Sequence, residues 1–246
     1  MEERDNTLRD LCKSACINWG LGSTHFQLPY EMDTETRNHS LRVCLYSIAI
    51  ANSLDLHKNR NLMKGFIEAS LQHDIGKANV EGIGFHYEKG VLVMGGRPFN
   101  DRYHFVNKKT EFTQEDRRRM NEHIDTGIIF IDEPAKSIVA LHHAWQKNPV
   151  LPLWLKSCKR TKETDYLSKL LAIADCFDAA LNRVNTRNSD VPKKLDLDKA
   201  IEVVLEEYRN LPIVYKRNEL PKIKTNGKEL IDYLSDYEIL EKIKVY

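Results

Sequence analysis

The residues of this chain that could do chemistry are imidazoles and carboxylates spread over several predicted helices. Glu35 and His39 are four residues apart, so both side chains project from one face of a helix. Two adjacent pairs follow further along the chain, and one carboxylate lies in the otherwise apolar stretch LLAIADCFDA. The candidate set is Glu35, His39, His73, Asp74, His123, His142, His143 and Asp175.

A set of this kind suits metal binding. Imidazole together with carboxylate favours iron, manganese or zinc over magnesium, which prefers oxygen ligands. His73 and Asp74 point about 100° apart if both are helical, so they share one site only at a helix end or between two metals. A carboxylate such as Asp74 can bridge two metals roughly 3.5–4 Å apart, which lower the pKa of a bridging water and neutralise a phosphoryl oxygen.

The same residues also have a structural interpretation. A lone histidine on a helix is more often structural than a ligand, and a His-Asp dipeptide is common. Asp175 could be a buried, hydrogen-bonded residue, because a carboxylate is costly to bury unless it is paired or bound to a cation. The co-occurrence of two pairs and a buried acid favours a metal, but spacing alone leaves both interpretations open.

The hydrophobic pattern predicts that helices position these residues. Apolar side chains at helical spacing predict helices over residues 7–19, 34–54, 61–73, 113–131, 135–145, 165–182, 198–210 and 227–243. Residues 79–110 differ, because they are rich in glycine and aromatic residues, and GVLVMGG is typical of a small hairpin or lid. We therefore expect an all-α fold with one irregular or hairpin insertion at about 80–106.

Composition limits the classes of partner. The chain has 246 residues, with 37 basic and 36 acidic side chains, so net charge indicates neither polymeric nucleic acid nor a membrane surface as a partner. Its five cysteines include no C-x-x-C pair, which favours reduced, partly buried thiols. The charged N-terminus shows no signal peptide and the apolar stretches are too short to span a membrane. We expect a cytoplasmic protein.

One motif carries a resemblance. LQHDIGKANVEG, residues 71–82, resembles the signature of the HD superfamily of metal-dependent phosphohydrolases. From about residue 35 to 208 the chain is most similar to the HD-GYP phosphodiesterases, which hydrolyse cyclic dinucleotides in bacterial signalling. The similar segments are NHSLRVCLYSIAIANSLDL, residues 107–127, ALHHAW and LLAIADCFDAAL. The resemblance implies an HD-domain helical bundle over 35–210, between an N-terminal helical extension at 1–34 and a C-terminal one at 211–246.

The resemblance also implies roles. The metal-ligand positions of the family fall on His39, His73, Asp74, His123, His142, His143 and Asp175. Asp74 would be the bridging carboxylate, and Glu35 matches the extra ligand of three-metal members. Lys77 matches a lysine that contacts the substrate phosphate, and Arg183 and Arg187 lie near the other phosphate-binding basic positions. The implied cofactors are two or three divalent ions, iron or manganese.

The sequence departs from the family pattern at one loop. The family follows its double histidine with Glu and then a GYP-containing loop, whereas this chain has Ala144 and reads HHAWQKNPVLP, so the 144–152 loop is altered. We expect a phosphodiesterase that cleaves a cyclic dinucleotide, such as cyclic di-GMP or cyclic GMP-AMP, or a related nucleotide, by a hydroxide that bridges the metals. The alternatives are a phosphohydrolase of another nucleotide or phosphomonoester, a non-catalytic nucleotide-binding module, and a di-iron oxygenase. The expected partner is a small nucleotide, and the sequence is compatible with a homodimer.

Overall fold

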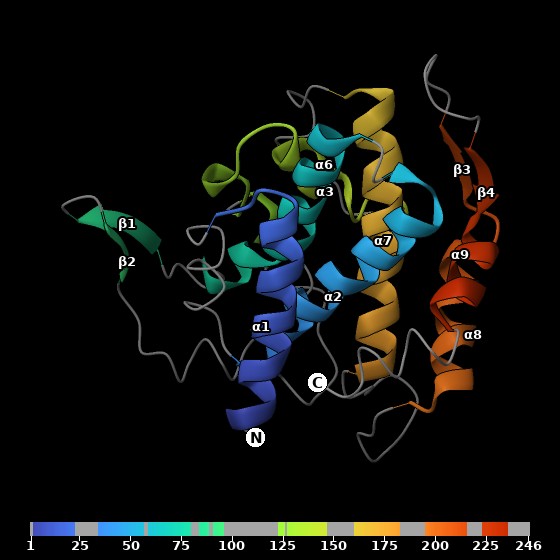
Figure 1. Cartoon of the computed structure of the whole chain (residues 1–246), viewed down its shortest axis with the longest axis horizontal. Coiled ribbons are helices and arrows are strands. Elements are labelled where there is room, and N and C mark those ends of the chain that lie inside the picture. Colours follow the sequence, from blue (N-terminus) through green and yellow to red (C-terminus); the bar gives the residue numbers. More distant parts are fainter. Residues whose placement is uncertain are drawn as a thin grey trace.

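The computed structural model describes residues 2–22, 34–56, 59–79, 84–88, 91–95, 123–125, 127–146, 160–182, 195–215 and 223–235. Within these ranges the chain is mostly helical, as the all-α prediction expects. The helices are α1 Glu2–Asn18, α2 Thr34–Ser53, α3 Arg60–Gln72, α6 Ala135–Leu141, α7 Lys162–Asn182, α8 Leu197–Tyr208 and α9 Gly227–Leu234, with short 3-10 turns η4 Ile75–Asn79 and η5 Ile128–Phe130 (Figure 1).

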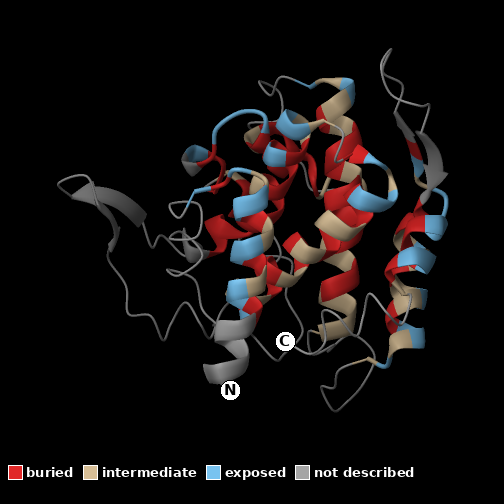
Figure 2. Ribbon diagram, viewed as in Figure 1, coloured by how far each residue is buried: buried red, intermediate tan, exposed pale blue. Residues whose placement is uncertain are grey.

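Helices α2 and α7 form the centre of the bundle. α2 packs against α7 and α3, while α6 packs against α3 and α7. The rings of Tyr46 on α2 and Phe177 on α7 meet edge to face, with centroids 5.3 Å apart. α1 packs against α2 on one side, and α8 and α9 cover α7 on the other. The buried residues lie on the faces that these helices turn toward one another (Figure 2).

The ends of two helices decide where adjacent ligand candidates point. α3 begins after Asn59, whose side chain accepts a hydrogen bond from the Leu62 amide at 3.2 Å, and it ends with His73 as its C-cap. The helix predicted over 135–145 is shorter in the structure: α6 ends at Leu141, and His142 is its C-cap. Each adjacent pair therefore lies at a helix end, where both side chains can reach one site.

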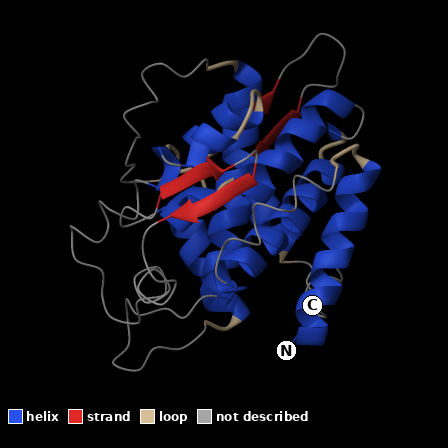
Figure 3. Cartoon of the chain, turned by 90° about the vertical axis from the view of Figure 1, so that its left-hand side faces the viewer, coloured by secondary structure: helices blue, strands red, loops and turns tan. Residues whose placement is uncertain are grey.

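Two antiparallel hairpins accompany the helices (Figure 3). Strands β1 Gly84–Glu88 and β2 Val91–Gly95 confirm the hairpin predicted from GVLVMGG, with Tyr87 opposite Leu92. Strands β3 Pro212–Tyr215 and β4 Ile223–Asn226 were not predicted. Lys169 of α7 donates a hydrogen bond to the Pro212 carbonyl at 2.8 Å, so this second hairpin is fixed by a tertiary contact that a local pattern does not reveal.

The flanking helices share the core of the central ones. Leu8 and Cys12 of α1, and Leu230 and Ile231 of α9, belong to one buried cluster with side chains of α2, α3 and α7. The predicted boundaries between the HD-like domain and its two extensions, at residues 34 and 210, remain predictions. Most of the helix predicted over 113–131 and the end of the one predicted over 227–243 lie outside the described residues. None of the described helices is long and apolar enough to cross a membrane.

Candidate metal centre

One group of candidate ligands lies where α2, α3 and α7 meet. His39 and His73 are fully buried, and Asp175 is 13 % exposed. The His39 Nε2 atom lies 2.9 Å from Asp175 Oδ1 and 3.3 Å from His73 Nε2, and His73 Nε2 lies 3.5 Å from Asp175 Oδ1. Three ligand atoms thus lie close together, although His39 and Asp175 are 136 positions apart in sequence.

A second group is formed by three histidines from the segment at 123–125 and from the end of α6. One ring nitrogen from each of His123, His142 and His143 lies within 4.8 Å of the others. The rings of His142 and His143 have centroids 3.9 Å apart, and the His123 ring contacts both edge-on. His142 and His143, although adjacent in sequence, therefore both belong to this second group.

Asp74 lies between the two groups. Its Oδ2 atom is 3.5 Å from His39 Nε2 and 3.6 Å from His73 Nε2, while its Oδ1 atom is 3.5 Å from His123 Nε2. One carboxylate oxygen thus faces the first group and the other faces the second. This is the arrangement that a carboxylate shared by two cations requires.

The tautomers of the imidazoles fit metal ligation. The Nδ1 atoms of His39, His73 and His142 donate to Asp178 Oδ2 at 2.6 Å, the Ser70 carbonyl at 2.8 Å and the Val139 carbonyl at 2.5 Å. A neutral ring that donates from Nδ1 presents a lone pair at Nε2, as in metal-bound histidine. The buried Nε2 atom of His142 has no hydrogen-bond partner among the described residues.

Those lone pairs converge and repel one another unless a proton or a metal cation lies between them. The donor set consists of imidazole nitrogens and carboxylate oxygens, which suits divalent iron, manganese or zinc. The buried histidines and aspartates of the two groups could therefore hold metal, and both groups offer enough donors for an ion each.

The electrostatic environment favours ionised carboxylates and a neutral His142, whereas Asp74 and Asp175 raise the pKa of His73 against the effect of burial. Burial opposes ionisation of Asp74, but Lys77 and the nearby histidines hold its pKa well below the ordinary value. Burial likewise opposes ionisation of Asp175, but His39 and His73 beside it lower its pKa. Burial, with His73, lowers the pKa of His142 to about 4. At neutral pH the site thus combines ionised carboxylates with a neutral His142.

Two residues that sequence analysis missed hold His39 in place. Asp178 is fully buried and accepts a hydrogen bond from His39 Nδ1, and Arg42 donates to both of its oxygens at 2.7 and 3.0 Å. Burial opposes ionisation of Asp178, but Arg42 and His39 lower its pKa to about 2. A second acid one turn after Asp175 in an apolar helix was the available signal, since it is as costly to bury as the first.

Asp178→Asn is expected to weaken metal binding about 10–100-fold, because a partner that orients a ligating histidine contributes that much to affinity. Metal titration monitored by calorimetry would measure the change. The matched control is Asp165→Asn, which alters a carboxylate on the same helix that also pairs with an arginine, Arg160, but at the surface. Equal affinities for Asp178→Asn and the unaltered protein would show that Asp178 does not orient a ligand.

Gly76 lets the segment that carries His123 approach the turn that carries Asp74. A Cβ atom at Gly76 would lie 1.7 Å from the His123 carbonyl oxygen and 2.6 Å from the Gly127 amide nitrogen. Any larger residue must push the backbone of His123 and Gly127 away. The close packing of two backbones thus sets the distance between Asp74 and the second group.

Gly76→Ala is therefore expected to lower the free energy of unfolding by about 1–3 kcal/mol and to weaken metal binding as well. Gly65→Ala is the matched control, because its Cβ would meet Pro134 Cγ at 2.6 Å, away from the ligands. Both variants should unfold at lower denaturant concentration, but only Gly76→Ala should lose metal affinity. Unchanged metal affinity in Gly76→Ala would contradict the positional role given to this glycine.

The remaining predicted site residues differ in their placement. Lys77 in η4 is 7 % exposed and its ammonium forms an ion pair with Asp74. Glu35 is exposed, one turn before His39, and is not part of either ligand group. Arg183 and Arg187 lie outside the described residues, as do residues 147–152 of the altered loop and much of the 80–106 insertion.

Comparisons of the chain with known protein families, with curated proteins and with solved structures found no match. The assignment of function therefore rests on the residues of the site.

Proposed function

We propose that this chain is a metal-dependent phosphohydrolase of the HD type, and that it acts as a phosphodiesterase on a cyclic dinucleotide or a related nucleotide. The observation that carries the proposal is the position of Asp74, with one oxygen toward each of two imidazole groups and the Lys77 ammonium beside it. A shared carboxylate with a cation next to it suits hydrolysis of an anionic ester better than a purely structural site.

The ligand groups would divide the metals between them. His39, His73 and Asp175 would hold one divalent ion, His123, His142 and His143 a second, and Asp74 would contact both. Bound there, divalent ions would lower the pKa of a water and neutralise charge on a phosphoryl oxygen. Glu35 is the proposed extra ligand if a third ion binds, and iron or manganese is the proposed metal.

Lys77 would bind the scissile phosphate. Its side chain is 8 % exposed, and it lies against Asp74 at the point where both ligand groups face the same carboxylate. Cations bound to Asp74 would compete with the lysine for that carboxylate and release the ammonium toward a phosphate oxygen. There it would stabilise the negative charge that develops during hydrolysis. Arg183 and Arg187 are proposed to hold the rest of the phosphate bidentately.

The substrate could differ from that of the HD-GYP enzymes. Ala144 replaces the glutamate that follows the family's double histidine, and the GYP loop is missing from the sequence. This difference favours, as a second candidate, hydrolysis of another nucleotide or of a phosphomonoester at the same site. A nucleotide-binding module without turnover is the alternative from another class.

A set of substrates given to anaerobically purified, metal-loaded protein would separate these functions. Cyclic di-GMP, cyclic GMP-AMP, a generic aryl phosphodiester and an aryl phosphomonoester would each be tested for release of product. Cleavage of a cyclic dinucleotide supports the first proposal, and cleavage of only the monoester supports the second. Binding of cyclic dinucleotide with no turnover of any substrate would overturn the enzymatic assignment.

A further inference from the structure

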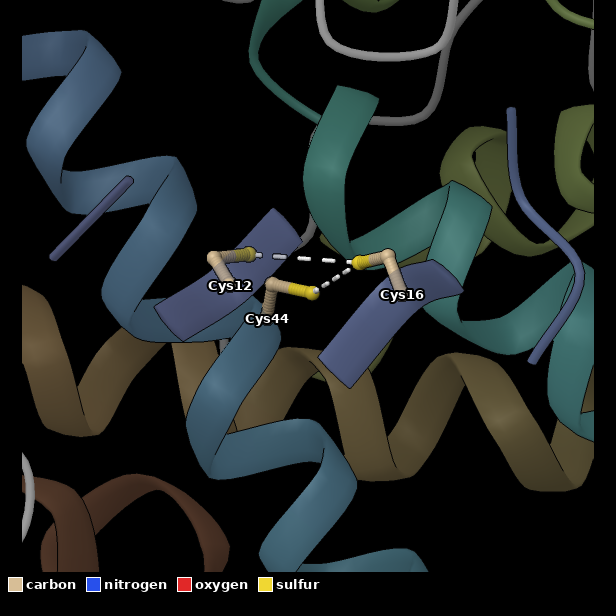
Figure 4. A group of neighbouring side chains, drawn as sticks. All are labelled: Cys12, Cys16 and Cys44. Carbon is tan, nitrogen blue, oxygen red and sulfur yellow. Dashed lines mark hydrogen bonds between the residues drawn. The ribbon is translucent and has the colours of Figure 1, made fainter. Parts of the chain in front are cut away.

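A separate group of potential metal ligands, made of three cysteines, lies between α1 and α2. The sulfur atoms of Cys12 and Cys16, one turn apart on α1, are 4.0 Å from each other, and the Cys16 sulfur is 3.9 Å from that of Cys44 on α2 (Figure 4). All three lie within 4.8 Å of one another and all three side chains are fully buried. None belongs to the His/Asp groups described above, and none is in a disulfide.

The spacing of these sulfurs fits one ion among them. Bonds of about 2.3 Å, the length of a zinc–thiolate bond, place three sulfurs in a trigonal plane about 4 Å apart. The observed separations of 4.0 and 3.9 Å need little movement to reach that arrangement. A disulfide would instead need two sulfurs to approach to about 2.05 Å, and it would leave the third sulfur unused.

The number and type of ligands restrict the kind of ion. The three residues belong to the apolar core cluster, and the ligand group found there among the described residues consists of three sulfurs alone. Structural zinc almost always takes four ligands, whereas soft thiolate sulfur also selects Cu(I), so a group of three sulfurs favours Cu(I) over zinc.

We propose that Cys12, Cys16 and Cys44 form a binding site for one soft, monovalent, thiophilic metal ion, of which Cu(I) is the physiological example. Each thiol that binds the ion loses its proton to solvent, because the thiolate is the form that ligates a metal. Because α1 packs mainly against α2, the ion would also fasten the first helix to the bundle. The site is independent of the His/Asp centre and does not require the proposed phosphohydrolase activity.

The test is an anaerobic Cu(I) titration of the full chain against a competing chromophoric chelator. We expect one Cu(I) per chain that is lost, or bound at least about 100-fold more weakly, in Cys44→Ala and Cys44→Ser, because each removes one of three ligands. Cys176→Ala, which alters a cysteine outside the group, should bind as the unaltered protein does. X-ray absorption should show sulfur neighbours alone.

Two readouts keep a folding defect apart from loss of a ligand. Circular dichroism should show the same helix content in the serine variant as in the unaltered protein, and Cu(I) should raise the Tm of the unaltered protein but not of the variant. Equal Cu(I) affinity in folded Cys44→Ser and the unaltered protein would overturn the proposal. So would nitrogen neighbours around the bound copper, which would assign it to the histidines.

Discussion

Replacing Asp74 by alanine is expected to remove metal and phosphohydrolase activity together, with turnover lowered by more than about 1000-fold. The reason is geometric. Asp74 has one oxygen 3.5 Å from His39 Nε2 and the other 3.5 Å from His123 Nε2, so this one carboxylate faces both ligand groups. Elemental analysis of the purified variant, alongside turnover of the substrate found active, would measure both losses.

The Asp74 variant needs a control for the loss of an acidic side chain. Asp232→Ala serves, because Asp232 also pairs with a lysine but lies on the surface of α9, 52 % exposed. It should retain full metal content and turnover. The fold of Asp74→Ala must also be checked, because the substitution removes the carboxylate that pairs with the buried Lys77 ammonium. Full metal content in a folded Asp74→Ala protein would show that the two groups do not depend on a shared carboxylate.

Lys77→Met is expected to separate catalysis from metal binding. The ammonium is proposed to stabilise charge on the phosphate and is not a ligand, so the variant should keep its metal while kcat/KM falls about 100–1000-fold. Removing the lysine also takes away the largest influence that lowers the pKa of Asp74, although the nearby histidines still act in the same direction. Metal affinity should therefore change much less than turnover.

Lys199→Met is the matched control for Lys77→Met. Lys199 pairs with Asp196 three residues earlier, the same spacing as Lys77 and Asp74, but both residues of that pair are more than half exposed. Turnover in this control should match that of the unaltered protein. Should Lys77→Met lose its metal as completely as Asp74→Ala, the lysine would have to be assigned to holding the site together instead of binding substrate.

The hydrophobic pattern was sufficient to predict the described helices. Apolar side chains at helical spacing gave α2, α3 and α7 to within a few residues, because these helices bury one face against their neighbours. The hairpin β3–β4 was missed, since its strands are only four residues each and α7 holds one of them through Lys169. Short strands fixed by tertiary contacts leave little periodic signal.

The site was predictable in its residue types but not in its grouping. His39 and Asp175 could be proposed from their spacing and from an acid in an apolar helix. The assignment of His142 and His143 to one group and His73 to another depends on where α3 and α6 end, and a boundary shift of one residue turns a side chain by about 100°. The close approach at Gly76 is likewise a backbone contact across 47 residues that no local pattern encodes.

The most direct measurement is the metal content of anaerobically purified protein, by elemental analysis and per folded chain. Two ligand groups that share Asp74 predict about two iron or manganese ions per chain, with a third if Glu35 also binds, and predict that Asp74→Ala loses them together. A chain that binds no iron, manganese or zinc under these conditions would contradict the metal centre and leave the buried histidines and aspartates as a hydrogen-bonded core.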